Sequence, residues 1–437
     1  MKDSGRIAAA IEVLSDVERT RRPVQDALKD WGLTHRFAGS KDRGAIGNLV
    51  FDVMRRKASL GAIMQADTPR ALVLAATVCI WGRSVEALAA GFADDRFAPA
   101  PLTDDERARL AACAIADDVA DWVKGDFPEW LEPSLRRSFG DRLIEEGRAL
   151  AGRAHVDLRV NSLKSTREAV LASLGHLDAK ACDWSPLGIR IPTGDADLKP
   201  GNAAAELSYK RGWFEIQDEG SQLASLVAAT GGGRQAIDLC AGGGGKALAL
   251  AAAFDNHGQI YAYDNNRRRF GDIVDRIERA GARNIQIREP RKEGDALADL
   301  KGRADLVLVD APCTGSGTWR RRPDAKWRLA PGALDLRLRE QATVLDRAAA
   351  LVAPGGRIVY VTCSVLPQEN EEQMAAFLER TPGFALGEAA AAFATVTGKE
   401  APVTTVLAGR DGGHMLRMTP LATGTDGFFV AILDRRA

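Results

Sequence analysis

Residues 304–318 read ADLVLVDAPCTGSGT, an apolar, β-branched run that ends at Asp310 and opens into a loop of Pro, Cys and Gly. Residues 356–364, GRIVYVTCS, repeat the arrangement with an apolar run that ends in Thr-Cys-Ser. Each run predicts a buried strand, and a parallel sheet places its working loops at the carboxyl ends of its strands. We therefore expect Cys313 and Cys363 to face one crevice, with Asp310 beside them.

Strand and helix patterns alternate around these stretches from about residue 234 onward. The expected strands are QAIDLC, QIYAYD, NIQIRE, ADLVLVD and GRIVYVTCS, and each is separated from the next by a helical or loop segment. This alternation predicts a doubly wound parallel sheet. GHMLRMTP (413–420) and GFFVAIL (427–433) predict a closing antiparallel pair.

The chain before this sheet divides into two further patterns. Residues 1–140 carry apolar positions at helical spacing, which predicts an all-α domain. Residues 141–225 contain short alternating runs broken by Gly, Pro and Asp, with one capped helix, which predicts a small α+β module. The expected fold class is α/β: a Rossmann-like sheet over residues 226–437, preceded by these two domains.

Composition limits the class of protein. The chain has 437 residues, 46% apolar and 27% charged, with zero net charge, which predicts two or three soluble domains. The first residues lack an apolar signal core and no long uncharged span is present, so cytoplasm is the expected location and no membrane partner is expected. We take a monomer as the default.

Six cysteines are scattered without CxxC or Cys/His spacing. This pattern argues against a disulfide framework and against a metal site. We expect Cys79, Cys113 and Cys182 to be small buried hydrophobic residues.

A glycine loop, AGGGGK (241–246), follows the acid Asp238, and Asp264 ends the next strand. Glycines allow backbone N–H groups to approach a ligand, and a carboxylate at this second position suits ribose hydroxyls. A phosphate-binding P-loop would need Gly at position 240 and Ser or Thr at 247, where the chain has Cys240 and Ala247. A dinucleotide fingerprint matches only loosely, so S-adenosylmethionine is the expected cofactor.

The two cysteines then gain a chemical role. Carbon 5 of a pyrimidine accepts a methyl group only after a thiolate has added to carbon 6 and turned the ring into an enamine, which is covalent catalysis. Asp310 is placed to hydrogen-bond the ring nitrogen or amino group of the base, and this role favours cytosine.

At this point the motifs amount to a resemblance. DAPCTGSGTWRRRPDAKW (310–327), TCSVLPQEN (362–370), RVNSLK (159–164) and DGFF (426–429) match those of the Sun family of RNA (cytosine-5) methyltransferases. The chain resembles in particular the bacterial 16S ribosomal RNA branch, whose helical N-terminal domain is similar to an antitermination factor and binds RNA. The implied substrate is therefore RNA, with 16S ribosomal RNA as the expected species.

The resemblance also implies roles for individual residues. Cys363 would be the nucleophile and Cys313 would assist product release, with Asp310 beside them. The implied cofactor contacts are Cys240, Ala241, Gly242, Gly243, Gly244, Gly245, Lys246, Asp264, Asp295 and Asp310, although Asp295 is alternatively a loop acid and Lys246 points either at the base or at the cofactor. Expected RNA contacts are Arg159, Asn161, Arg320, Arg321, Arg322 and Lys326, the last four being interleaved with Trp319 and Trp327.

The chain departs from the family pattern in its glycine loop. The family usually has CAAPGGKT, whereas Gly242 and Gly243 replace Ala-Pro here and Ala247 replaces Thr. Loss of a proline adds freedom to the unfolded chain, so we expect weaker cofactor binding but retained activity. Two alternatives stay open: the same chemistry on transfer RNA or DNA, and a ribosome-assembly factor that binds RNA without turnover.

Overall fold

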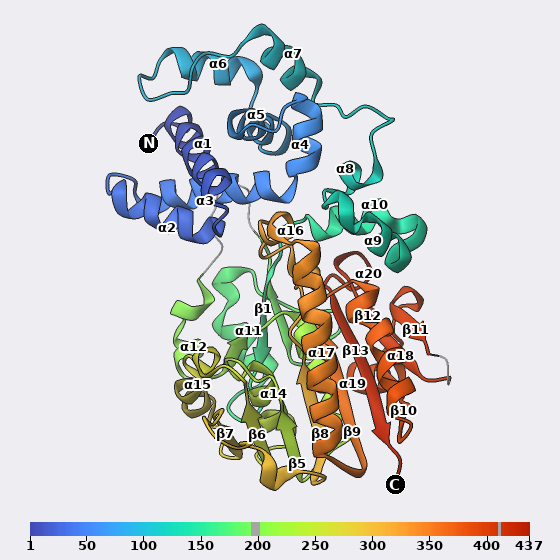
Figure 1. Cartoon of the computed structure of the whole chain (residues 1–437). Coiled ribbons are helices and arrows are strands. Elements are labelled where there is room, and N and C mark those ends of the chain that lie inside the picture. The colour runs from blue at the N-terminus through green and yellow to red at the C-terminus, as the bar shows by residue number, and fades with distance from the viewer. Residues whose placement is uncertain (194–201, 410–411) are drawn as a thin grey trace. The chain divides into compact units, whose positions relative to one another are not determined.

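The computed structural model describes residues 1–193, 202–409 and 412–437, and the chain forms two compact units (Figure 1). Unit 1 contains Met1–Arg153 and Trp319–Leu329. Unit 2 contains Ala154–Pro192, Gly201–Thr318 and Ala330–Ala437. The three domain boundaries expected from the sequence remain a prediction.

Unit 1 is built from helices, as the apolar periodicity predicted. Its α-helices are α1 (Asp3–Thr20), α2 (Val24–Thr34), α3 (Ser40–Arg55), α4 (Lys57–Met64), α5 (Pro69–Ala75), α6 (Val85–Ala93), α7 (Asp104–Ala112), α8 (Asp121–Gly125), α9 (Glu132–Phe139), α10 (Leu143–Leu150) and α16 (Ala325–Arg328), and a π-helical turn, η1 (Ala76–Ile80), extends α5. Side chains fix several helix starts: Thr68, Ser84 and Thr103 each accept a backbone N–H at the first turn of α5, α6 and α7.

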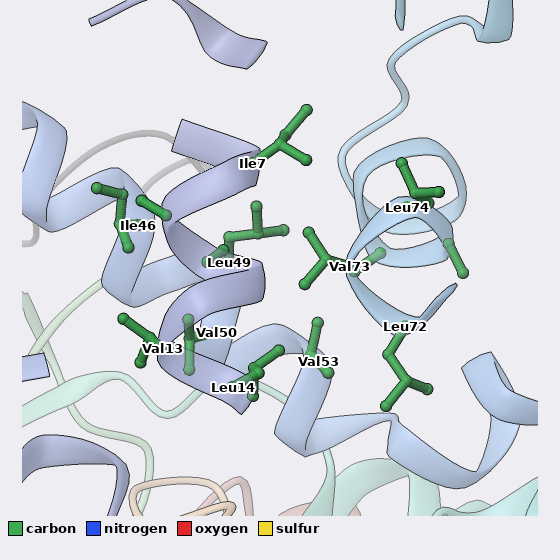
Figure 2. Packing of buried hydrophobic residues seen from close by; sticks show 14 of the residues in the cluster. Ile7, Val13, Leu14, Ile46, Leu49, Val50, Val53, Leu72, Val73 and Leu74 are labelled. Carbon is green, nitrogen blue, oxygen red and sulfur yellow. The ribbon is translucent and has the colours of Figure 1, made fainter. Parts of the chain in front are cut away.

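The core of unit 1 lies between α1, α3 and α5 (Figure 2). Apolar side chains spaced three or four residues apart put one face of each helix inward. The labelled members are Ile7, Val13 and Leu14 of α1, Ile46, Leu49, Val50 and Val53 of α3, and Leu72, Val73 and Leu74 of α5. Each of these side chains stabilises the fold by roughly 1.5–3 kcal/mol through burial.

Within the described ranges, no single helix has the length and apolar composition needed to cross a membrane. Only a bent pair, Lys57–Met64 with Pro69–Ile80, passes that test jointly, and its two halves meet at 96°. Both halves supply buried residues to the core of unit 1.

The cysteines of unit 1 contradict the expectation that Cys79 and Cys113 are simply small buried residues outside any disulfide. Cys79 at the end of η1 and Cys113 after α7 form a disulfide with a Cα–Cα distance of 5.7 Å. The two residues are 34 positions apart, so neither spacing nor a local motif marked them as partners. Cys182 is a buried free thiol, as expected.

Unit 2 contains a small antiparallel sheet of order β2-β3-β1-β4. Its strands are β1 (Val156–Val160), β2 (Lys180–Ala181), β3 (Gly188–Ile191) and β4 (Phe214–Ile216), accompanied by α11 (Arg167–Ser173) and α12 (Leu207–Lys210). Leu158 and Val160 of β1 pack with Ile189 of β3 and Phe214 of β4, and all four side chains are buried.

The large sheet of unit 2 has the order β11-β12-β13-β9-β8-β5-β6-β7, with β10 paired to β13. The strands are β5 (Gln235–Asp238), β6 (Gln259–Tyr263), β7 (Ile285–Arg288), β8 (Ala304–Asp310), β9 (Val352–Thr362), β10 (Phe384–Leu386), β11 (Val406–Ala408), β12 (His414–Met418) and β13 (Phe428–Arg435). Strands β5 to β9 pair in parallel, whereas β10 to β13 pair antiparallel. The predicted doubly wound sheet and its closing antiparallel pair are confirmed.

Helices cover both faces of this sheet. Successive residues of a strand point to opposite faces of the sheet. In β8, Leu306 and Leu308 therefore pack against a first set of helices, and Val307 and Val309 pack against a second set on the other face. The first set is α13 (Glu219–Ala229), α14 (Gly245–Ala253), α15 (Ile273–Ala280) and α19 (Ala389–Thr397), and the second is α17 (Pro331–Leu351) and α18 (Glu371–Arg380). Figure 1 shows α17 running along β8 and β9. The short α20 (Pro420–Thr423) precedes β13.

Candidate active site

Two loops meet where β8 and β9 end. Asp310 is the last residue of β8 and lies opposite Val361 of β9 in the parallel register. The loops that follow bring the Sγ atoms of Cys313 and Cys363 to 3.4 Å. The two cysteines therefore share one location, as the two strand-loop patterns predicted.

Cys313 is held as a neutral thiol. The hydrogen bond with Cys363, then burial, and then the charges of Cys363 and Glu369 raise the pKa of Cys313 well above its ordinary value. A thiol that keeps its proton can donate a hydrogen bond to a neighbouring sulfur. Cys313 is thus a neutral thiol in contact with the Cys363 sulfur.

The loop after β8 is also fixed by a close backbone crossing with the start of β13. Gly427 N–H donates to Gly317 O over 2.8 Å, and Gly317 N–H donates to Cys363 O over 2.9 Å. A Cβ on Gly427 would lie 2.6 Å from the Cα of Gly317, so the crossing requires glycine. This packing explains why the DGFF segment accompanies the cysteine loop.

The buried Lys246 and the half-buried Asp310 form an ion pair beside the cysteines. Lys246 Nζ donates to Asp310 Oδ2 over 2.6 Å, and Nζ lies 5.6 Å from the ring centre of Phe428. Burial alone would lower the pKa of Lys246, but the charge and hydrogen bond of Asp310, with smaller contributions from Asp238 and Cys363, raise it. Lys246 therefore carries a positive charge within the site.

The glycine loop lies between β5 and α14 and is tied down by Asp264. The Gly242 and Asn266 N–H groups donate to the two oxygens of Asp264 over 3.1 and 2.9 Å. Gly242 and Gly244 have φ values of 49° and 78°, in the left-handed region that favours glycine. A Cβ on Gly244 would also lie 2.7 Å from Ile273.

Asp238 is a buried carboxylate that has no hydrogen-bond partner among the described residues. Burial, followed by the charge of Asp310, raises its pKa to about 7, and the nearby Cys240 and Ala247 amides lower it without making well-formed bonds. A buried acid without donors is unfavourable unless something else pairs with it. The sequence interpretation took an acid at this position as a feature that suits the amino group of S-adenosylmethionine, but it did not include Asp238 among the predicted cofactor contacts.

A cavity of about 290 Å³ opens beside the glycine loop. Its lining includes Cys240, Tyr263, Asn265 and Pro312, from the carboxyl ends of β5, β6 and β8, together with residues of α17. This is the edge at which open parallel sheets bind ligands. Cys240 thus lines the cavity, and burial, followed by the charge of Asp238, raises its pKa, so it remains a neutral thiol.

Among the described residues, Asp295 forms no hydrogen bond with the glycine loop. It accepts Arg347 Nη2 at 2.6 Å and the Leu297 N–H at 3.0 Å. Partial burial acts against ionisation, but the Leu297 N–H and Arg347 hold the pKa of Asp295 below its ordinary value. Its only link to the cavity is Arg347, which is one of the lining residues.

Arg159 and Asn161, expected as RNA contacts, are buried and hold unit 2 together. Arg159 Nη1 donates to Gly245 O over 2.7 Å, and Asn161 Nδ2 donates to Gly212 O and Ala280 O over 2.9 and 2.8 Å. With 3% and 4% exposure, neither side chain reaches solvent. In this structure they are therefore not exposed for the predicted RNA contact, and they connect the small sheet to α14 and to the end of α15.

The basic segment after the cysteine loop belongs to unit 1, and its expected RNA contacts are only partly exposed. Arg322 is exposed and Arg321 half-buried, whereas Arg320 and Lys326 are buried. Lys326 Nζ donates to the carbonyls of Arg55 and Asp126. An amino group enclosed in this way stabilises the helices of unit 1, and Arg320 is also buried, so neither side chain is exposed for the RNA contact that the sequence predicted.

Glu369 is the residue of this site that the sequence interpretation missed. Its side chain is fully buried, and it accepts hydrogen bonds from both cysteine loops. Its position in the PQEN part of the TCSVLPQEN motif (362–370) was the available signal. Among the described residues, no group of three or more His, Cys, Asp or Glu side chains is arranged to hold a metal ion.

Comparison with known proteins identifies the family. A model of the 16S rRNA methyltransferase RsmB/F family matches residues 227–434, and a model of the ferredoxin-like domain of RsmF/B-like methyltransferases matches residues 127–195. The chain is 31% identical over 319 residues to the probable ribosomal RNA small subunit methyltransferase B of Synechocystis, which covers 71% of this chain and 67% of that protein. The chain belongs to the RsmB/F family.

Other RsmB/F relatives agree with this membership. The ribosomal RNA small subunit methyltransferases B of Enterobacter and Salmonella typhi are each 32% identical, over 257 and 273 residues. These matches cover 58% and 60% of the chain but only 58% and 59% of the relatives, so the chain spans less than two thirds of their length.

Solved structures show the same fold. The crystal structure titled PH0851 has a TM-score of 0.71 at 25% identity and covers 99% of both chains. The structure titled NSun6 from Pyrococcus horikoshii with SFG has a TM-score of 0.58 at 21% identity, covering 71% of this chain and 99% of that one. The second likeness concerns the fold alone.

Proposed function

We propose that this RsmB/F family member transfers a methyl group from S-adenosylmethionine to carbon 5 of a cytosine in 16S ribosomal RNA. The single observation that carries the chemistry is the pair of thiols at 3.4 Å, beside the Lys246–Asp310 ion pair. Two sulfurs in one site suit a reaction in which one adds to the base and the other assists its departure.

The residues beside the sheet fit the proposed cofactor. The buried carboxylate of Asp238, which lacks a donor of its own, suits an ammonium group, and Asp264 retains acceptor capacity for ribose hydroxyls. The cavity beside Cys240, Tyr263 and Pro312 suits the adenine ring. When bound, S-adenosylmethionine supplies an electrophilic methyl group on a sulfonium.

The cysteines would act in order. The Cys363 thiolate adds to carbon 6 of the cytosine and makes carbon 5 nucleophilic. After carbon 5 has been methylated, a base takes its proton and the bond from carbon 6 to Cys363 breaks. Cys313, which keeps its proton and whose sulfur lies 3.4 Å from that of Cys363, assists this departure.

Lys246 and Asp310 would act on both the cytosine and the nucleophile Cys363. The ion pair fixes one oxygen of Asp310, and the other can accept the amino group of cytosine. The positively charged Lys246 also lies close enough to Cys363 to interact with it electrostatically.

The proposal that the substrate is RNA is based on membership of the RsmB/F family. A looped-out or flipped cytosine is required, because carbon 6 is not reachable in a stacked helix. We assign RNA binding to the helical residues 1–140, with Arg321 and Arg322 as the accessible basic residues of the segment after the cysteine loop. An enzyme that acts on ribosomal RNA would work in the cytoplasm.

Bisulfite sequencing of 16S ribosomal RNA and transfer RNA, from cells with and without the gene, tests the proposal. Loss of one ribosomal 5-methylcytosine in the deletion strain, restored by the wild-type gene, is the expected result. Loss in transfer RNA alone would move the substrate to that class. No change in either pool would overturn the enzymatic proposal in favour of a binding factor.

A further inference from the structure

Glu369 ends the 3-10 turn η9 (Pro367–Glu369) that follows the TCS loop, and its side chain has 0% exposure. Both carboxylate oxygens accept hydrogen bonds from several sides. Oε1 accepts the Thr314 N–H at 2.8 Å and Gln341 Nε2 at 3.0 Å, and Oε2 accepts the hydroxyls of Thr314 and Ser364.

These donors come from the two loops that carry the thiols. Thr314 directly follows Cys313 in the loop after β8, and Ser364 directly follows Cys363 in the loop after β9. One carboxylate therefore spans both loops. The link is reinforced by the Ser316 and Ser364 hydroxyls, whose oxygens are 2.9 Å apart.

The arrangement suits an anion. The two oxygens accept from an amide N–H, a side-chain NH₂ and two hydroxyls, so all four hydrogen bonds use the acceptor capacity of the carboxylate. A glutamine at this position that keeps its oxygen toward the Thr314 N–H and Gln341 Nε2 would turn its NH₂ group toward the Thr314 and Ser364 hydroxyls, so both hydroxyls would have to reverse and the charge-assisted hydrogen bonds would become weaker neutral ones. Burial raises the pKa of Glu369, while the hydroxyl and N–H donors oppose that rise.

We propose that Glu369 is a positioning residue: by bridging Thr314 and Ser364 it fixes the separation of the Cys313 and Cys363 thiols. The role of those thiols in methylation rests on the proposed function, but the geometric claim does not. Among the described residues Glu369 makes no hydrogen bond to either sulfur, and it does not line the cavity, so it acts through the two loops.

Oxidative cross-linking measures the thiol separation without RNA or cofactor. Diamide takes two electrons and two protons from a pair of thiols and leaves a disulfide, and peptide mass spectrometry follows the Cys313–Cys363 bond. Glu369→Gln should slow its formation by about tenfold, since displacement by about 1 Å strongly reduces reactions between positioned groups. Glu379→Gln, an identical change at an exposed site on α18, should react like the wild type.

A second variant keeps the test independent of folding. Ser364→Ala removes only one hydroxyl of the bridge and should slow cross-linking as well, with an unchanged circular dichroism spectrum. Wild-type cross-linking rates in both Glu369→Gln and Ser364→Ala would overturn the proposal.

Methylation provides the second readout. If the wild-type chain methylates 16S ribosomal RNA, Glu369→Gln should lower kcat while leaving KM for RNA near the wild-type value, because the thiols and not the RNA contacts are displaced. A raised KM with unchanged kcat would contradict the positioning role. Failure of the wild type to methylate would refute the proposed function, and the cross-linking rates would still decide the role of Glu369.

Discussion

Gly317→Ala perturbs the backbone crossing that places the cysteine loop against β13. The added Cβ would lie 2.1 Å from the carbonyl oxygen of Gly427 and 2.6 Å from its Cα. Ordinary contacts of a Cβ begin at 3.4 Å, so the two segments must separate by about 1.3 Å, the difference between 3.4 and 2.1 Å. That movement breaks the 2.8 Å hydrogen bond from Gly427 N–H to Gly317 O.

The expected loss of stability follows from these two effects. Forced overpacking costs about 1–3 kcal/mol and the lost hydrogen bond about 0.5–1.5 kcal/mol, so Gly317→Ala should lower the free energy of unfolding of unit 2 by about 2–4 kcal/mol. Hydrogen exchange read by mass spectrometry along a urea series measures unit 2 peptides separately from those of unit 1.

Gly332→Ala is the matched control, because a Cβ there meets nothing within 4 Å and the residue lies in the first turn of α17. The control should be neutral or more stable by up to about 1 kcal/mol, as for glycine replaced in a helix. A Gly317→Ala variant within about 0.5 kcal/mol of the wild type, the range of ordinary surface substitutions, would refute the crossing as a constraint.

Three further perturbations test other parts of the structure. Gly244 has a φ of 78°, and an added Cβ would lie 2.7 Å from Ile273, so Gly244→Ala should strain the glycine loop by roughly 1–2 kcal/mol. Calorimetry should then show S-adenosylmethionine binding weakened by about tenfold, and an unchanged affinity would contradict this prediction. Burial lowers the pKa of Lys326 from 10.5 to about 7, so between these values the unfolded chain binds a proton that the folded chain has released, and unit 1 should gain stability as pH rises. Lys326→Met should flatten that rise, and equal slopes would contradict the lowered pKa of Lys326. The Cys79–Cys113 disulfide closes a 34-residue span, so its reduction should lower the free energy of unfolding of unit 1 by about 3–4 kcal/mol. Urea titrations with and without reductant measure this difference, and superimposable unfolding curves would contradict a stabilising disulfide.

The sheet and its cysteine loops could be predicted because local sequence determines them. β-branched runs such as residues 304–310 form strands, and the Pro and Gly that follow end them. Parallel pairing then brings the carboxyl ends of neighbouring strands to one edge, so Cys313 and Cys363 meet without further information. The glycine loop and Asp264 followed from the same rule.

The burial of the basic side chains and the pairing of two cysteines depend on tertiary contacts, which the sequence does not show. A run of arginines and lysines predicts a solvated or RNA-binding face, but Lys326 is enclosed by backbone carbonyls and Arg159 by Gln217 and Gly245. Long basic side chains bury their stems readily, and sequence alone does not show which carbonyls receive the head group. The pairing of Cys79 with Cys113 likewise depends on how helices pack, which spacing does not encode.

The most direct test of the central claim is a denaturing gel of purified variants incubated with 16S ribosomal RNA and S-adenosylmethionine. Cys313→Ala should accumulate a covalent protein–RNA band, because Cys363 adds to the base but its release is unassisted, while Cys363→Ala should give neither band nor methylation. A covalent band formed by Cys363→Ala, or normal turnover by that variant, would contradict the assignment of Cys363 as the nucleophile.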